Sequence, residues 1–246
     1  MWDNHFMTKS EEHFTNVRGE IINPAHRLVT NPETGRRWSQ YIDDKMPRSL
    51  FRQVGLIDTA GSTEWFNVVE HSALVAALAH KIATDLRAHG VDVSAITVER
   101  AAWVHDATKR RDVMEKMSRD DETSDTLLDR LLQDAGYSDP EISAAHNTGR
   151  LADRFIEDED ERMAAIRKRT VAENIVGYAD ARTRGAQLMT LEDAKLDSIS
   201  KKPGESDFFE QSWYPYYKDV EAYFSSIASG YDVQTVNNQS VVESIS

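Results

Sequence analysis

The chain of 246 residues contains no cysteine. This absence excludes disulfide bonds, zinc sites built from thiolates and a thiol nucleophile. It also favours a reducing compartment, so we expect a cytoplasmic protein. The first residues, MWDNHFMTKSEEHF, lack the basic and then apolar pattern of a secretory signal, which agrees with that expectation.

Long apolar runs and an excess of positive charge are missing as well. No stretch approaches the ~20 consecutive apolar residues that a transmembrane helix needs, so no membrane partner is expected. The 29 Lys and Arg residues are outnumbered by 42 Asp and Glu residues, which gives a net charge of -13. Bulk binding to nucleic acid requires a basic surface and is therefore not expected. A small anionic substrate in a locally basic cleft remains compatible with this charge.

Helical periodicity is the main pattern that the sequence does contain. Most windows repeat apolar residues at helical spacing, and few alternate apolar and polar residues as strands do. The fold class is therefore predicted to be all-α. We predict helices over residues 48–54, 64–89, 98–109, 124–135 and 171–184, one that begins at Asp139-Pro140, and one that the TLED box at residues 190–193 caps.

Both ends of the chain differ from this helical middle. Residues 1–60 read as a mainly irregular N-terminal extension, with turn signals at Asn31-Pro32 and Thr34-Gly35. Residues 201–246 are predicted to hold an aromatic helix followed by a polar, frayed tail. The aromatic helix either packs on the bundle or supplies a lid or stacking ring for a nucleobase.

The charge run over residues 156–162 reads IEDEDER. A run of this kind is typical of a solvated helix face or a loop. We therefore predict that it lies at the surface.

Four ionisable side chains, His71, His105, Asp106 and Asp180, fall on or beside the apolar faces of three predicted helices. A buried charge or imidazole without a partner costs several kcal/mol. One such residue has the ordinary explanation of a core histidine bonded to the backbone, but four together indicate a common partner. Two imidazoles and two carboxylates suit a divalent metal ion with open coordination positions. The sequence does not distinguish Mn²⁺, Fe²⁺, Co²⁺, Ni²⁺, Mg²⁺ and Zn²⁺.

The order His … His-Asp … Asp resembles that of the HD-domain superfamily of metal-dependent phosphohydrolases. Among its branches, the chain is most similar to the one with diadenosine-tetraphosphate-cleaving and related nucleotide hydrolases. The segments that carry the resemblance are VVEHSALVAALAHKIA (Val68–Ala83), AAWVHDATKR (Ala101–Arg110), ISAAHNTGR (Ile142–Arg150) and NIVGYADARTRG (Asn174–Gly185).

The resemblance implies an HD-type helical bundle in residues 61–200, with N- and C-terminal extensions. It implies that His71, His105, Asp106 and Asp180 hold the metal ion between helices. It also implies that Lys109, three residues after Asp106, meets substrate phosphate or the anion on the metal.

His146 matches a histidine that binds a second metal ion in the binuclear members. Those members carry one more histidine before it, whereas this chain has none from 107 to 145. Asp120, Asp121 and Glu122 lie near the expected place. We therefore expect one complete metal site. His146 would be either a ligand of an incomplete second site or a contact to phosphate.

The chemistry that follows is hydrolysis of a phosphoester or phosphoanhydride bond of a small phosphorylated substrate, most readily a nucleotide. A metal-bound water, held through Asp106 and the other ligands, would attack phosphorus. Lys109, Arg150 and Arg184 would offset charge on the phosphoryl oxygens, and His146 would give a hydrogen bond or a proton to the leaving oxygen. The ordinary alternative for all three cations is a solvated surface residue.

Two other functions stay open. The bundle could be a non-catalytic regulatory or ligand-binding domain, or a di-iron oxygenase of the same superfamily. The kind of bond cleaved is also open, and so is assembly into a homo-oligomer.

Overall fold

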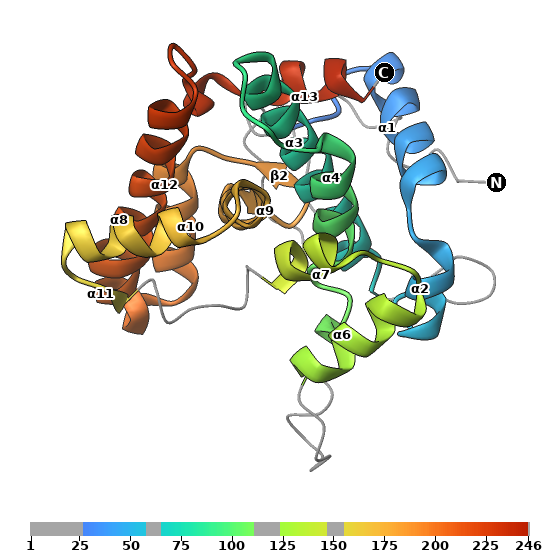
Figure 1. Cartoon of the computed structure of the whole chain (residues 1–246). Helices are drawn as coiled ribbons and strands as arrows, with labels where there is room; N and C mark the ends of the chain where they lie inside the picture. The colour runs from blue at the N-terminus through green and yellow to red at the C-terminus, as the bar shows by residue number, and fades with distance from the viewer. Residues whose placement is uncertain (1–26, 58–64, 111–123, 147–154, 246) are drawn as a thin grey trace.

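The computed structural model describes residues 27–57, 65–110, 124–146 and 155–245. In this part of the chain a single two-stranded sheet accompanies the helices, so the prediction of a helical protein is confirmed (Figure 1). The elements are α1 (Pro32–Lys45), α2 (Arg48–Gln53), α3 (Phe66–Ala88), α4 (Ala95–Val104), α6 (Ser124–Asp134), α7 (Asp139–Ala145), α8 (Glu159–Lys168), α9 (Val171–Ala181), β1 (Thr183–Arg184), β2 (Gln187–Leu188), α10 (Leu191–Lys201), η4 (Pro203–Glu205), α11 (Ser206–Phe208), η5 (Phe209–Trp213), α12 (Tyr214–Ile227), η6 (Val233–Thr235) and α13 (Asn238–Ser244).

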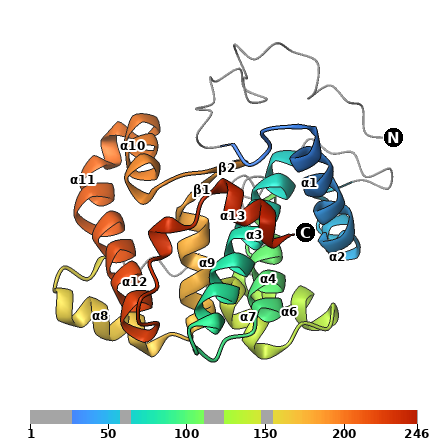
Figure 2. The ribbon, with the colours of Figure 1, turned by 90° about the horizontal axis from the view of Figure 1, so that it is seen from above.

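Helix α3 is the centre of the molecule, with α4, α9 and α13 packed around it (Figure 2). Its apolar positions do not form one narrow stripe, and its middle is buried on nearly every side. A helix that is apolar all round belongs in a core. Five alanines among the buried residues let the neighbouring helices approach closely; they are Ala73, Ala76, Ala77, Ala79 and Ala83.

The N-terminal extension contains a helix that we did not predict. Asn31 accepts a hydrogen bond from the Thr34 backbone amide, and the Thr34 hydroxyl receives one from the Asn31 amide, so the two form a capping box. Pro32 then occupies the first turn of α1, where its missing amide costs nothing. The reading of these residues as turn signals in an irregular segment is therefore wrong for 32–45.

The C-terminal tail is helical rather than frayed. Helix α13 begins at a second capping box, formed by Asn237 and Ser240. Its Val241 and Val242 side chains are buried, and the helix packs on α3. Two buried valines in a polar stretch give too weak a periodic signal to predict a helix.

The charge run over 156–162 also differs in part from the prediction. Asp158 caps α8 by accepting from the Glu161 amide. Arg162 is buried and donates from Nε to Asp219 of α12 at 2.5 Å. Arg162 thus joins α8 to α12 through a buried contact, while most of the other residues in the run are exposed.

Two helices end earlier than predicted, and both ends form part of the candidate site. Helix α4 stops at Val104, and residues 105–108 form turns. Helix α9 stops at Ala181, where the Thr183 hydroxyl donates to the Ala179 carbonyl and the chain enters the β1–β2 hairpin.

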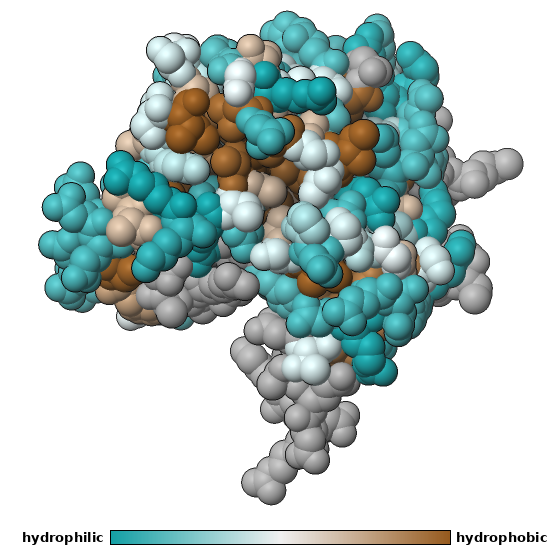
Figure 3. All heavy atoms as spheres, viewed as in Figure 1, coloured by the Kyte–Doolittle hydropathy of each residue, from teal (hydrophilic) through white to brown (hydrophobic). Residues whose placement is uncertain are grey.

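Hydrophilic side chains cover most of the face in Figure 3, as the charge of the chain leads one to expect. No helix in the described ranges is long and apolar enough to span a membrane.

Candidate metal centre

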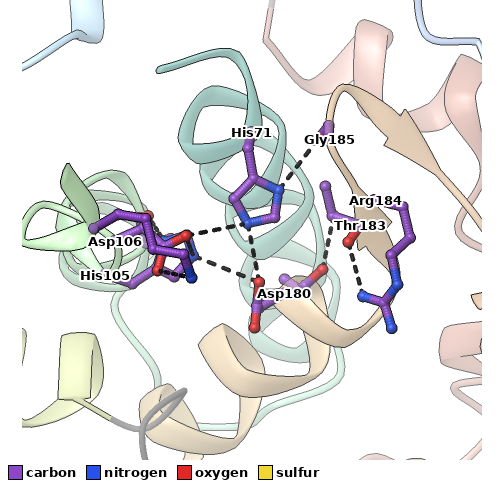
Figure 4. Close-up of polar contacts among 10 residues, drawn as sticks. His71, His105, Asp106, Asp180, Thr183, Arg184 and Gly185 are labelled. Atoms are coloured by element: carbon purple, nitrogen blue, oxygen red, sulfur yellow. Dashed lines mark hydrogen bonds and ion pairs between the residues drawn. The ribbon is translucent and has the colours of Figure 1, made fainter. Parts of the chain in front are cut away.

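The structure brings together the four side chains that the sequence singled out (Figure 4). His71 lies in the first third of α3, His105 and Asp106 directly follow α4, and Asp180 lies near the end of α9. The three helices pack on one another, so residues far apart in the chain face a common point.

The Nε2 atoms of both histidines face both carboxylates. His71 Nε2 lies 3.0 Å from Asp180 Oδ1 and 3.9 Å from Asp106 Oδ2. His105 Nε2 lies 3.5 Å from the same Asp180 oxygen and 3.9 Å from the same Asp106 oxygen. Ligand atoms of His71, His105 and Asp106 all lie within 4.8 Å of one another, as a shared ion requires.

The other ring nitrogen of each histidine faces a backbone carbonyl. His71 Nδ1 lies 3.2 Å from the oxygen of Gly185, and His105 Nδ1 lies 2.7 Å from that of Ala102. A carbonyl only accepts, so each Nδ1 carries the proton and donates it. The two Nε2 atoms are thereby directed at the carboxylates, which is the orientation that metal-binding histidines adopt.

The carboxylates dominate the electrostatics of the centre. Burial lowers the pKa of His105, but the neighbouring Asp106 and Asp180 carboxylates more than offset this and raise it to about 9. Burial raises the pKa of Asp180, but the neighbouring His105 and His71 imidazoles more than offset this and hold it well below the usual range. The carboxylates therefore favour positive charge at Nε2 of His105, which a proton or a metal ion can supply.

The donor set fits a divalent metal ion. Neighbouring ligands about 2.1 Å from an ion in tetrahedral or octahedral geometry lie about 3.0–3.4 Å apart. The 3.0 Å separation of His71 from Asp180 lies in this range, and the 3.5 Å separation of His105 from Asp180 lies just above it. The separations of 3.9 Å from Asp106 require a small inward shift. His105 Nε2 is buried and, among the described residues, has no well-formed hydrogen bond, as expected of a ligand atom.

Comparison with known proteins gives no relative. No family model, no curated protein and no solved structure matches this chain. The geometry of the centre is then the observation from which a function is inferred.

Lys109 lies at the rim of the centre. Its Nζ is 3.5 Å from Asp106 Oδ1, while the other oxygen of Asp106 faces the histidines. The lysine side chain is 49% exposed, so it borders both the centre and solvent.

His146 lies at the end of α7, and its Nε2 is 2.7 Å from Oδ1 of Asp129 on α6. Sequence reasoning did not single out Asp129, because nothing in a leucine-rich amphipathic helix marks one surface carboxylate. The role of His146 as a phosphate contact or second-site ligand stays a prediction.

Arg184 is held away from the four side chains (Figure 4). Its guanidinium donates to the Thr183 carbonyl and the Ser198 hydroxyl, and it lies 5.3 Å from the centroid of the Trp213 ring. These contacts tie β1 to α10 and η5. Arg150, the other arginine of the prediction, lies outside the described residues, as do Asp120, Asp121 and Glu122.

The aromatic C-terminal segment packs on the molecule. The rings of Phe209, Trp213, Tyr216 and Tyr217 are buried, and Trp213 and Tyr217 meet edge to face with centroids 5.1 Å apart. The packing interpretation of this segment is therefore the one that the structure supports.

The carbonyl acceptors of the centre left no sequence signal, and a partly buried carboxyl group beside His71 in the chain was passed over. The carbonyl acceptors at Gly185 and Ala102 are backbone groups, which no residue type reveals. Glu70 precedes His71 on α3, and burial raises its pKa to about 7.

Proposed function

We propose that the protein is a metal-dependent phosphohydrolase of the HD type. The observation that carries the proposal is the convergence of two histidines, whose Nδ1 atoms face backbone carbonyls, with two aspartates, all in or directly after three packed helices. The order of these four residues along the chain resembles that of the HD-domain superfamily, and this supports the proposal.

In this proposal His71, His105, Asp106 and Asp180 hold one divalent ion. When bound, such an ion activates water and polarises the phosphoryl group. The carboxylates of Asp106 and Asp180 are 21% and 28% exposed, whereas the His105 side chain is fully enclosed. A substrate therefore approaches from the carboxylate side, where solvent also has access.

Lys109 lies beside the outer oxygen of Asp106, on the partly exposed side of the centre. Its ammonium group, next to the outer oxygen of Asp106, attracts a phosphoryl oxygen and offsets the charge that develops there. Arg150 is proposed as a second phosphate contact. Arg184 would have to leave Ser198 to take that role.

His146 is proposed to give a proton to the leaving oxygen. Its contact with Asp129 orients the imidazole, as a carboxylate partner does for an acid–base histidine. The substrate class is a small phosphorylated molecule, with a nucleotide as the first choice from the resemblance.

The proposal is tested by metal analysis and by phosphate release from a panel of nucleotides, phosphomonoesters and phosphodiesters. Wild-type protein should bind about one divalent ion per chain and hydrolyse some member of the panel with added Mn²⁺, Co²⁺ or Ni²⁺. Asp106→Asn should lose both properties, because it removes a charged ligand.

The matched control is Asp85→Asn, a partly buried, lysine-paired carboxylate on α3. It should keep both the metal and the activity. Hydrolysis of nothing in the panel by metal-loaded wild type would contradict the proposal, and tight nucleotide binding without turnover would point to a regulatory domain instead.

A further inference from the structure

The two histidines of the centre obtain their carbonyl acceptors in different ways. His105 uses Ala102, three residues earlier on its own helix, so α4 supplies the acceptor wherever it forms. His71 uses Gly185, which lies 114 residues away on the β1–β2 hairpin. The orientation of His71 therefore depends on an element that is distant in sequence.

From this asymmetry we propose that the β1–β2 hairpin is the positioning element of His71 and that Gly185 is its positioning residue. The inference rests on the proposed role of His71 as a metal ligand. Without an acceptor at Nδ1, the imidazole ring is free to rotate or to place its proton on Nε2. In the second case Nε2 has no lone pair to offer a metal ion.

The backbone conformation of Gly185 explains why a glycine occupies the turn. Its φ is +57°, in the left-handed region that a side chain disfavours. A Cβ atom added at Gly185 would meet nothing within 4 Å. The constraint is therefore the backbone angle that aims the carbonyl at His71, and not a lack of space.

Arg182 fixes the base of the hairpin. Its Nε donates to the Met189 carbonyl at 2.8 Å, and the Met189 amide donates back to the Arg182 carbonyl at 2.8 Å. The two remaining guanidinium nitrogens donate to the carbonyls of Val233 and Val236. The C-terminal segment thus holds the hairpin, and the hairpin holds His71.

A glycine series tests the positioning role through Co²⁺ affinity, measured by absorption titration. Gly185→Val demands a strained φ and should weaken Co²⁺ binding about 10- to 100-fold, the usual effect of losing a partner behind a metal ligand. Gly185→Asn should restore most of the affinity, because asparagine tolerates positive φ. Gly185→Ala replaces Gly185→Val if that variant does not fold.

The matched control is Gly136→Val at the end of α6. Gly136 has a φ of +77° and also has nothing within 4 Å of an added Cβ. It should lose thermal stability as Gly185→Val does and keep the Co²⁺ affinity of wild type.

Two variants, each at a buried arginine, test in the same assay whether Arg182 holds the hairpin in place. Arg182→Lys should weaken Co²⁺ binding, because one ammonium cannot bond three carbonyls in different directions. Arg162→Lys changes a buried arginine that joins α8 to α12, and it should lower stability without changing Co²⁺ affinity.

The proton on His71 Nδ1 provides a readout that is independent of activity. In Zn²⁺-loaded wild type, NMR of ¹⁵N-histidine should show it as a slowly exchanging signal, which Gly185→Val should lose. Wild-type Co²⁺ affinity and an unchanged signal in Gly185→Val would overturn the inference. If wild type binds no metal at all, the proposed function fails, and the same signal in metal-free protein still tests the contact with Gly185.

Discussion

At the residue scale, Asp106 has two oxygens with different partners. Oδ2 faces the histidines and Oδ1 faces Lys109. The side chain thus lies between the histidines proposed to bind metal and the cation proposed to meet phosphate. Substitutions on the two sides should therefore have different effects, one on metal binding and the other on catalysis.

Lys109→Ala should lower kcat/KM by about 10- to 100-fold, less than a fully enclosed donor would, since this lysine is half exposed. The metal content should stay that of wild type, because Lys109 is not a ligand. Steady-state kinetics with metal analysis of the same samples measures both quantities. Lys81→Ala, which breaks a pair with Asp85 on α3, is the control and should leave kcat/KM unchanged. Loss of metal in Lys109→Ala would contradict the assignment.

A second charged residue, Glu99, should make stability depend on pH. Burial raises the pKa of its carboxyl group, but contacts with His80, Lys45 and Tyr41 outweigh burial and lower it below its usual value. A carboxyl whose pKa is lowered by folding stabilises the protein above its unfolded pKa, about 4.3, and loses that contribution as the pH falls.

Glu99→Gln should therefore cost about 1–3 kcal/mol in the free energy of unfolding at pH 7, and the difference from wild type should shrink below about pH 4. Urea unfolding at the two pH values measures it. Glu33→Gln, at an exposed pair with Arg37, should cost under about 0.5 kcal/mol at either pH. A pH-independent loss in Glu99→Gln would show that the charge of Glu99 is not what stabilises the fold.

Sequence reasoning singled out four side chains that the structure brings together, but it did not predict the groups that they contact. His71, His105, Asp106 and Asp180 stood out because an ionisable residue on an apolar helix face needs a reason. Gly185 and Ala102 act through backbone oxygen, and the pairing of His146 with Asp129 depends on how α6 meets α7. Neither kind of contact has a residue-type signal.

At the element scale, the start of α1 rests on a small group of polar contacts. Asn31 and Thr34 satisfy backbone amides that the first turn of α1 leaves unpaired. Asn31→Ala should lower the free energy of unfolding by about 1 kcal/mol, the typical worth of such a cap. Chemical denaturation measures the loss, and Asn31→Asp, which keeps an acceptor at the cap, should restore most of it. An unchanged stability in Asn31→Ala would show that α1 does not depend on its cap.

The same segment shows why element boundaries were the weaker part of the sequence prediction. Asparagine, proline and threonine favour turns and helix starts alike, because in both they satisfy backbone amides locally. The centre of α3 was easier to predict, since its apolar residues continue for six turns. The ends of α4 and α9 depend on tertiary contacts, such as the hairpin after Ala181.

At the scale of the whole molecule, the candidate centre joins three helices of the core. A metal ion held there binds only the folded chain, so it should stabilise the protein by mass action. At a free concentration 100 times the dissociation constant the gain is about 2.7 kcal/mol, or about 5–10 °C in Tm for a chain of this size.

Thermal unfolding with and without Mn²⁺, Co²⁺ or Ni²⁺ should show this increase, and a chelator should reverse it. Asp180→Asn should abolish the increase, because it removes the carboxylate closest to both histidines. Asp85→Asn should respond like wild type. An increase of equal size in Asp180→Asn would place the bound metal elsewhere on the protein.

The candidate centre also has an order in which its parts can come together during synthesis. Two sets of contacts determine it: the bond from His71 to Gly185, and those of Arg182 with Val233 and Val236. A chain made from its amino end presents His71 long before its carbonyl partner, and the hairpin is anchored only after residue 236 has emerged. His71 of α3 and His105 after α4 can thus meet early, whereas the finished centre also requires residues 233–236. The proposed metal site of a newly made chain is therefore complete only after residue 236, whose carbonyl helps to anchor the hairpin, has emerged.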